Sequence, residues 1–128
     1  MHGKKNKFID IFCGVGGLSN GFLNHGFNLI YGIDNDKNLF ETFIKNHPQS
    51  TLIKDDVRNI TKEFISNNFK NLDLLVAGIP CQSFSMSGYR IRKNTKYIYD
   101  YRTYLFKDVI RIIEICRPSV IIFENVKG

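Results

Sequence analysis

Short apolar runs alternate with segments of helical periodicity along this 128-residue chain, and this alternation limits the possible folds more than any other feature. The runs have the length of β-strands and extend over about Phe8–Phe12, Leu29–Ile33, Thr51–Ile53, Leu72–Ala77 and Val120–Phe123. The last two are almost continuously apolar, as expected for strands that are buried on both faces. Helical segments between successive strands predict an α/β fold with a doubly wound, mostly parallel sheet.

The segments between these runs carry the spacing of helix faces. A helix is expected from about Leu18 to His25, where Gly26 ends it. Pro48 and Pro118 end two further helices. The apolar faces of the later helices are predicted to be Leu39, Phe40, Phe43 and Ile44, then Ile60, Phe64 and Ile65, then Leu105, Val109, Ile112, Ile113 and Cys116.

The composition fits a single globular domain. Hydrophobic residues make up 43% of the chain, which is enough for a core without disulfide or metal staples. The three cysteines, Cys13, Cys81 and Cys116, include no Cys-x-x-Cys pair, so we expect no disulfide framework, no metal site and a cytoplasmic location. The stretch Ile11–Ile33 has no formal charge, but its glycines and polar side chains exclude a membrane helix.

Positive charge is concentrated in one segment. The chain has 18 Lys and Arg against 12 Asp and Glu, a net charge of +6. Tyr89–Lys107 holds six cations and one anion, with five of the six tyrosines among them. Cations that neutralise phosphates, mixed with rings that pack on sugars and bases, indicate a nucleic-acid-facing loop. A solvated basic loop is the alternative that charge alone leaves open.

In doubly wound sheets, ligands bind outside the carboxyl ends of the strands. Gly14, Gly16 and Gly17 form a turn there, after the first strand, and their bare backbone lets a cofactor approach closely. Asp34 follows the second strand, where a carboxylate can hold ribose hydroxyls, so a nucleoside-containing cofactor is expected. Asp56, after the third strand, is placed for an adenine contact. The structural alternatives are a turn or cap role for Asp34 and a helix cap for Asp56.

Other chemistries are less well supported. The dinucleotide pattern places its third glycine three residues after Gly16, where this chain has Ser19, so a nicotinamide cofactor is disfavoured. A thiol hydrolase needs a histidine beside its cysteine. His25 and His47 lie in predicted helices, so no cysteine–histidine pair is evident.

Cys81 and Glu124 follow the fourth and fifth strands, at the same predicted edge of the sheet. Pro80 stiffens the backbone before the thiol, so Cys81 is displayed, whereas Cys13 and Cys116 fit packing positions. A thiol and a carboxyl beside a cofactor suggest attack on an electron-poor ring with an acid partner. Only about 3% of an ordinary thiol is ionised at neutral pH, so the site must help to remove its proton.

Three motifs resemble those of the cytosine-5 DNA methyltransferases in order and spacing. Phe8–Gly17 resembles the family's cofactor motif, Gly78–Ser85 its catalytic Pro-Cys loop, and Glu124–Val126 its Glu-Asn-Val motif. Arg102–Phe106 is similar to a fourth, weaker motif. The resemblance covers essentially the whole chain and implies a Rossmann-like, S-adenosylmethionine-dependent methyltransferase fold in an enzyme of the restriction-modification type.

The resemblance also implies roles for individual residues. Residues implied to hold S-adenosylmethionine are Phe12, Gly14, Val15, Gly16, Gly17, Asp34, Asp56 and Leu105. Cys81 would add to carbon 6 of a cytosine turned out of double-stranded DNA, and Glu124 would bond that base near ring nitrogen 3. Residues implied or expected to contact DNA are Gln82, Ser85 and Ser87 in a closing loop, and Arg90, Arg92, Lys93 and Lys96 on phosphates.

The chain departs from the family pattern in three respects. Asn35 stands where members often place an aromatic residue against the adenine, and Thr103 where they usually have glycine. After Gly128 no residues supply the family's later arginine motif or its target-recognition region. We therefore expect residues 1–128 to form the N-terminal part of a catalytic domain, apparently truncated, which a C-terminal half or complementing subunit completes. A non-catalytic fragment and a nicotinamide oxidoreductase are the alternatives.

Overall fold

The computed structural model describes residues 6–80 and 101–125, with the side chains of 101–103 left aside. Its five strands form one sheet in the order β3-β2-β1-β4-β5, and every neighbouring pair is parallel. The strands are β1 (Lys7–Ile11), β2 (Asn28–Asp34), β3 (Thr51–Lys54), β4 (Leu74–Gly78) and β5 (Val120–Glu124). The predicted parallel α/β sheet is confirmed.

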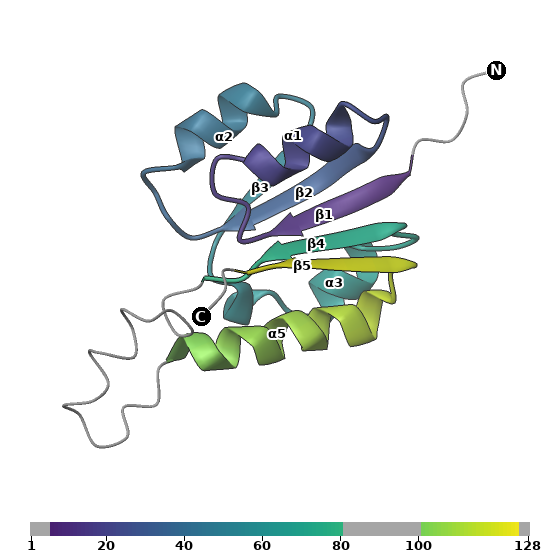
Figure 1. Cartoon of the computed structure of the whole chain (residues 1–128). Helices are drawn as coiled ribbons and strands as arrows, with labels where there is room; N and C mark the ends of the chain where they lie inside the picture. The colour runs from purple at the N-terminus through teal and green to yellow at the C-terminus, as the bar shows by residue number, and fades with distance from the viewer. Residues whose placement is uncertain (1–5, 81–100, 126–128) are drawn as a thin grey trace.

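Helices cover both faces of this sheet (Figure 1). One face carries α1 (Gly17–Leu23) and α2 (Phe40–Asn46), and the other carries α3 (Lys62–Asn68) and α5 (Tyr101–Cys116). The chain crosses from one side of β1 to the other between β3 and β4, so the strand order reverses at β1 and β4. A crevice outside the carboxyl ends of these two strands is where doubly wound sheets bind ligands.

The core consists of two hydrophobic clusters, one on each face of the sheet. On the α1 and α2 face, Phe8, Leu29 and Phe43 are almost completely buried. A Cβ on Gly32 would lie 2.4 Å from Cζ of Phe43, so only glycine lets α2 pack this closely on β2. Cys13 is buried in the same cluster, as predicted.

The second cluster lies between the sheet and the helices α3 and α5. Ile9, Ile65 and Val109 are buried at its centre, and Cys116 packs half-buried against it. Between β3 and α3 the chain forms a short 3-10 helix, η1 (Val57–Asn59), before α3 begins. Ile60, predicted to lie in a helix, is instead buried in the connection between η1 and α3.

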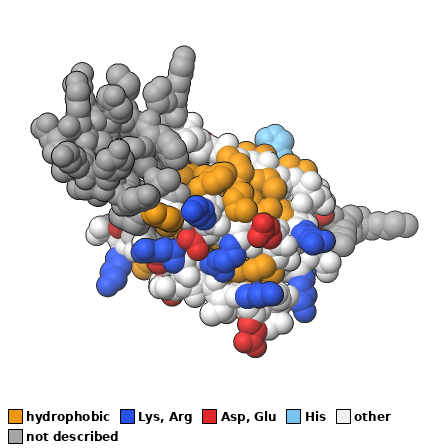
Figure 2. Space-filling model, turned by 90° about the horizontal axis from the view of Figure 1, so that it is seen from below, with side chains coloured by type: hydrophobic (Ala, Val, Ile, Leu, Met, Phe, Trp, Pro, Cys, Tyr) orange, Lys and Arg blue, Asp and Glu red, His pale blue; other side chains and the backbone are white. Residues whose placement is uncertain are grey.

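The prediction that Val120–Phe123 is a fully buried strand is wrong. β5 lies at the edge of the described sheet, and Val120, Ile121 and Phe123 are 53%, 40% and 41% exposed. Phe123 stacks on the exposed ring of Phe106 from α5, with ring centroids 5.4 Å apart. Figure 2, which views the molecule from the side of α5, shows hydrophobic side chains gathered on this surface. An apolar sequence shows that a strand can be buried on both faces, but it does not show whether a neighbouring strand or helix is there to bury it.

Candidate cofactor and catalytic site

The glycine turn between β1 and α1 has a backbone that only glycine adopts easily. Gly14 and Gly16 have φ angles of +56° and +83°. The N–H of Gly16 donates to the carbonyl of Cys13 at 2.8 Å, which closes the turn. The carbonyl of Gly16 then accepts the N–H of Asn20 at 3.1 Å, which begins α1. The predicted glycine turn at the carboxyl end of β1 is therefore present.

Phe12, at the start of this turn, has a left-handed backbone with φ +60°. Such a conformation is strained for a bulky residue and costs on the order of 1–3 kcal/mol. The rest of the turn holds it there, because the N–H of the next residue, Cys13, donates to the carbonyl of Ile33 at 3.1 Å. Strain of this kind is concentrated at functional sites, which supports the prediction that Phe12 borders one.

Asp34 connects the ends of β1 and β2. Its Oδ2 accepts the N–H of Gly14 at 2.8 Å, and its Oδ1 accepts the N–H of Asp36 at 2.9 Å. The turn role that the sequence left open is thus real. Each carboxylate oxygen has two acceptor directions, so both oxygens can still accept a hydroxyl.

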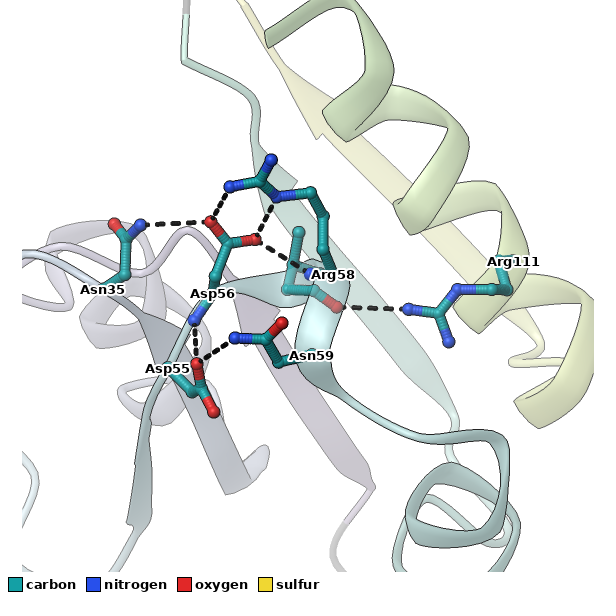
Figure 3. A network of polar contacts seen from close by, with 7 residues as sticks. Asn35, Asp55, Asp56, Arg58, Asn59 and Arg111 are labelled. Atoms are coloured by element: carbon teal, nitrogen blue, oxygen red, sulfur yellow. Dashed lines mark hydrogen bonds and ion pairs between the residues drawn. The ribbon is translucent and has the colours of Figure 1, made fainter. Parts of the chain in front are cut away.

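Asp56 is held by a denser network, shown in Figure 3. Its side chain accepts the N–H of Arg58 as the cap of η1, and the guanidinium of Arg58 donates to both carboxylate oxygens at 2.8 and 2.7 Å. These bonds from Arg58 hold the pKa of Asp56 below its usual range. Asn35 adds a 3.4 Å bond to Oδ2. The capping role is confirmed. A ligand amine that reached this carboxylate would displace the amide of Asn35, which makes the longest of the four hydrogen bonds to Asp56.

Glu124 lies where the ends of β4 and β5 meet. It is the register partner of Gly78, and a Cβ built on Gly78 would lie 3.5 Å from Oε2 of Glu124 and 3.9 Å from the carbonyl oxygen of Phe12. The ends of β1, β4 and β5 therefore bring Phe12, Gly78 and Glu124 together at one edge of the sheet. The side chain of Glu124 is exposed, as a residue that meets a substrate must be.

The remaining predicted site residues lie outside the described residues, in the glycine turn, or in the core. Cys81 follows Gly78 by three residues and lies outside the described residues, as do the predicted DNA contacts Gln82, Ser85, Ser87, Arg90, Arg92, Lys93 and Lys96. Val15, in the glycine turn, is 39% exposed, and a Cβ on Gly17 would meet nothing within 4 Å. Leu105 is only 6% exposed and belongs to the core cluster beneath α5. The structure thus groups the turn residues with Asp34 and Glu124.

The cysteines that the structure describes are not placed as nucleophiles. Burial raises the pKa of the Cys116 thiol to about 11. Burial, together with the charges of Asp10 and Asp34, raises the pKa of Cys13 even further. Both side chains therefore stay protonated, in agreement with the packing roles predicted for them.

Two buried polar residues beside the glycine turn were not among the predicted site residues, and one of them, His47, lies just after α2 rather than in a helix. Asp10, on β1, is 1% exposed and accepts the hydroxyl of Ser19 from α1 at 2.5 Å. Burial and, to a smaller extent, the charge of Asp34 raise the pKa of Asp10 to about 6, although the hydrogen bond from Ser19 lowers it. A charged residue inside an apolar strand was the signal for Asp10. His47 is 3% exposed and packs against the glycine turn. No pattern in the sequence around it indicated this position.

Comparison with known proteins decides the family. The model of the family described as C-5 cytosine-specific DNA methylase matches residues 6–128. The chain belongs to this family. It is 38% identical over 122 residues to the type II methyltransferase M.FnuDI of Fusobacterium nucleatum, and 33% identical over 142 residues to a DNA-cytosine methyltransferase of Escherichia coli K12.

The fold comparison agrees with the family assignment. The chain superposes on a prophage-encoded protein of Escherichia coli, described as a DNA modification methyltransferase, with a TM-score of 0.78 and 31% identity. The match covers 97% of this chain and 33% of that protein. M.FnuDI and the K12 enzyme are likewise matched over 95% of this chain but 33% and 30% of their own lengths. The chain thus spans about a third of the length of these three relatives.

The family assignment and the described residues bear on cofactor, substrate, metal and membrane binding by this C-5 cytosine methylase chain. Methyltransferases of this family generally use S-adenosylmethionine, and DNA is the substrate that the family name states. Among residues 6–80 and 101–125, no three His, Cys, Asp or Glu side chains form a group that could hold a metal ion. No helix in the same residues is long and apolar enough to cross a membrane.

Proposed function

We propose that this chain is the cofactor-binding and catalytic part of a DNA (cytosine-5)-methyltransferase of the restriction-modification type. The observation that carries the proposal is the meeting of Phe12, Gly78 and Glu124 at the carboxyl ends of three adjacent strands. It brings the start of the glycine turn next to the acid and to the strand that leads into Cys81. Membership of the C-5 cytosine methylase family favours methyl transfer over the nicotinamide chemistry that the glycine turn alone would also permit.

S-adenosylmethionine fits the groups around the glycine turn. Gly17 is exposed and Gly14 half-buried, so the backbone at these two positions is open to close approach, whereas Gly16 is buried beneath His47 and shapes the turn. Asp34 has an acceptor direction free on each oxygen for ribose hydroxyls. When bound, the cofactor supplies an electrophilic methyl group. We assign Phe12 and Val15 to its surroundings, and Asp56 to the adenine end, where Asn35 would give way. Leu105 supports the site from the core.

Cys81 and Glu124 divide the chemistry of the cytosine ring. The Cys81 thiolate adds to carbon 6, which makes carbon 5 nucleophilic enough to accept the methyl group. Glu124 bonds the base at ring nitrogen 3 and the amino group, and so neutralises the charge that develops during the addition. Loss of the proton from carbon 5 and elimination of the cysteine restore the aromatic ring. An exposed carboxyl at the sheet edge is suited to this role.

Double-stranded DNA is the proposed substrate, and the flipped base costs a few kcal/mol of stacking and pairing. Gln82, Ser85 and Ser87 belong to the loop that closes over the DNA. Arg90, Arg92, Lys93 and Lys96 would neutralise phosphates and offset part of the cost of flipping.

We further propose that residues 1–128 are the N-terminal part of the catalytic domain and that a C-terminal part, in the same or a separate chain, completes it. The relatives are about three times as long as the part that this chain matches. In the described sheet β5 is an edge strand, so the proposed C-terminal part can add to the sheet beside it and cover the exposed side chains of Val120, Ile121 and Phe123.

Methyl transfer tests this proposal. The chain is incubated with tritiated S-adenosylmethionine and duplex DNA, alone and together with the C-terminal part of a relative such as M.FnuDI. We expect label in DNA cytosine with the complemented wild type and with the control Cys116→Ser, and none with Cys81→Ser. Equal label with Cys81→Ser would reject the assigned nucleophile. Binding of the cofactor without transfer under any complementation would favour the non-catalytic alternative.

A further inference from the structure

The helix α2, together with the residues that flank it at both ends, packs against the glycine turn. A Cβ on Gly14 would lie 4.0 Å from Cδ1 of Leu39, the residue before α2. The amide of Asn46 donates to the carbonyl of Val15 at 3.2 Å. His47, which caps the helix, lies with Nε2 3.0 Å from the carbonyl oxygen of Gly16. Successive residues of the turn are thus held from one helix.

His47 makes the tightest of these contacts. Its ring is 3% exposed and packs on Phe43, with ring centroids 4.7 Å apart. A Cβ on Gly16 would lie only 1.9 Å from Nε2, so the ring occupies the space that any side chain at this position would need. The carbonyl of Gly16 also accepts the N–H of Asn20. His47 therefore holds the carbonyl at which α1 begins.

The hydrogen bond fixes the tautomer of the His47 ring. A carbonyl oxygen can only accept, so Nε2 must carry the proton, and in the neutral ring Nδ1 is then an acceptor. Nδ1 is the one buried side-chain nitrogen or oxygen of the described residues that has no hydrogen-bond partner. A buried polar atom without a partner costs stability. A phenylalanine ring would lose the Nε2 hydrogen bond but would avoid this cost and still pack on Phe43. The two effects oppose each other, so stability alone does not favour histidine here.

We propose that His47 is a positioning residue for the cofactor, acting through the Nε2 hydrogen bond that holds the Gly14–Gly17 turn in its binding shape. The inference rests on the proposed function, in which this turn binds S-adenosylmethionine. It assigns to a residue outside the cofactor motif, on a different helix, a share of the cofactor affinity. It also accounts for a buried histidine that the chemistry of cytosine does not use.

Calorimetric titration of S-adenosylmethionine into four forms of the chain tests this role. His47→Phe keeps the ring and removes the donor, whereas His47→Gln keeps a donor near the position of Nε2. The matched control is His25→Phe, because His25 also bonds a backbone carbonyl, that of Gly21 at 2.7 Å, but lies in the exposed turn that follows α1. Thermal unfolding of each form is measured in parallel.

We expect His47→Phe to weaken cofactor binding about tenfold while its thermal midpoint stays equal to or above that of the wild type. His47→Gln should bind within about threefold of the wild type, and His25→Phe should be unchanged. Equal affinity of His47→Phe and wild type, or equal losses in His47→Phe and His47→Gln, would overturn the proposal and leave the proposed function standing. Absence of binding by the wild-type chain would instead reject the cofactor assignment and the inference together.

Nitrogen-15 NMR of the wild-type chain gives a readout that needs no variant. We expect the Nε2 of His47 to carry a proton, because the carbonyl oxygen of Gly16 can only accept. A ring protonated on Nδ1 alone would remove the hydrogen bond on which the proposal depends.

Discussion

Replacing Asp10 by asparagine should change how the stability of this chain depends on pH. Asp10 is buried on β1, and burial raises its pKa from 3.8 to about 6. The folded state therefore binds a proton more tightly than the unfolded state, so the stability contributed by this group is complete below the unfolded pKa and is lost as the pH rises through the folded pKa. A rise of about two units corresponds to about 3 kcal/mol, at 1.36 kcal/mol per unit.

Asparagine at position 10 cannot ionise, and its side-chain oxygen can still accept the Ser19 hydroxyl, which bonds Asp10 at 2.5 Å. Relative to the wild type, Asp10→Asn should therefore gain up to about 3 kcal/mol of unfolding free energy between about pH 4 and pH 7. A poor fit of the amide would lower the unfolding free energy of Asp10→Asn by the same amount at every pH. The change of the difference between the two forms with pH would therefore remain.

The assay is urea unfolding of both forms at several pH values in this range, with the slope m compared as a check that the unfolded states are alike. Taking the difference between the two forms cancels the other titrating groups. A difference that stayed flat with pH, or that favoured the wild type at neutral pH, would show that Asp10 is not held in an environment that disfavours its charge.

Three further predictions concern the glycine turn, Asp56 and the basic segment. In denaturant unfolding, Gly16→Ala should lose more than about 2 kcal/mol of stability, because its Cβ would overlap His47 and its φ is positive. The control Gly21→Ala, in the helix α1 with open space around it, should gain about 1 kcal/mol. Asp56→Asn should show the opposite pH dependence to Asp10→Asn, because Arg58 lowers the pKa of Asp56. Asp56→Asn should be less stable than the wild type at neutral pH and equally stable in acid, and a loss of stability that persisted in acid would contradict this. Neutralising Arg90, Arg92, Lys93 and Lys96 should reduce the slope of log DNA affinity against log salt by about 0.9 for each phosphate that the variant no longer neutralises, and an unchanged slope would mean that the segment is only solvated.

The sequence predicted the sheet and the glycine turn well, because both follow from local patterns. Apolar runs bounded by glycine and proline predicted the five strands, and a turn that needs positive φ at Gly14 and Gly16 can be recognised from those glycines alone. The carboxyl ends of parallel strands then bring Glu124 beside Gly78.

What the sequence could not provide depends on neighbours distant along the chain. β5 has the composition of a buried strand, but its exposure is set by the neighbours that are present, and in the described sheet it lies at an edge. The contact of His47 with Gly16 spans 31 residues and follows from how α2 packs on the sheet. Asp34 and Asp56 both have the structural roles that the sequence left open as alternatives, because a carboxylate after a strand serves a turn or a ligand equally well.

The central claim is that the sulfur of Cys81 attacks a cytosine held by Glu124. The most direct measurement uses duplex DNA in which 5-fluorocytosine replaces the target, since fluorine blocks the proton loss from carbon 5 that would release the enzyme. After incubation of the complemented chain with S-adenosylmethionine, the covalent adduct is digested and mapped by mass spectrometry. The account predicts an adduct on Cys81 that Glu124→Gln strongly diminishes. An adduct on Cys13 or Cys116, or one whose yield is the same without the Glu124 carboxylate, would contradict it.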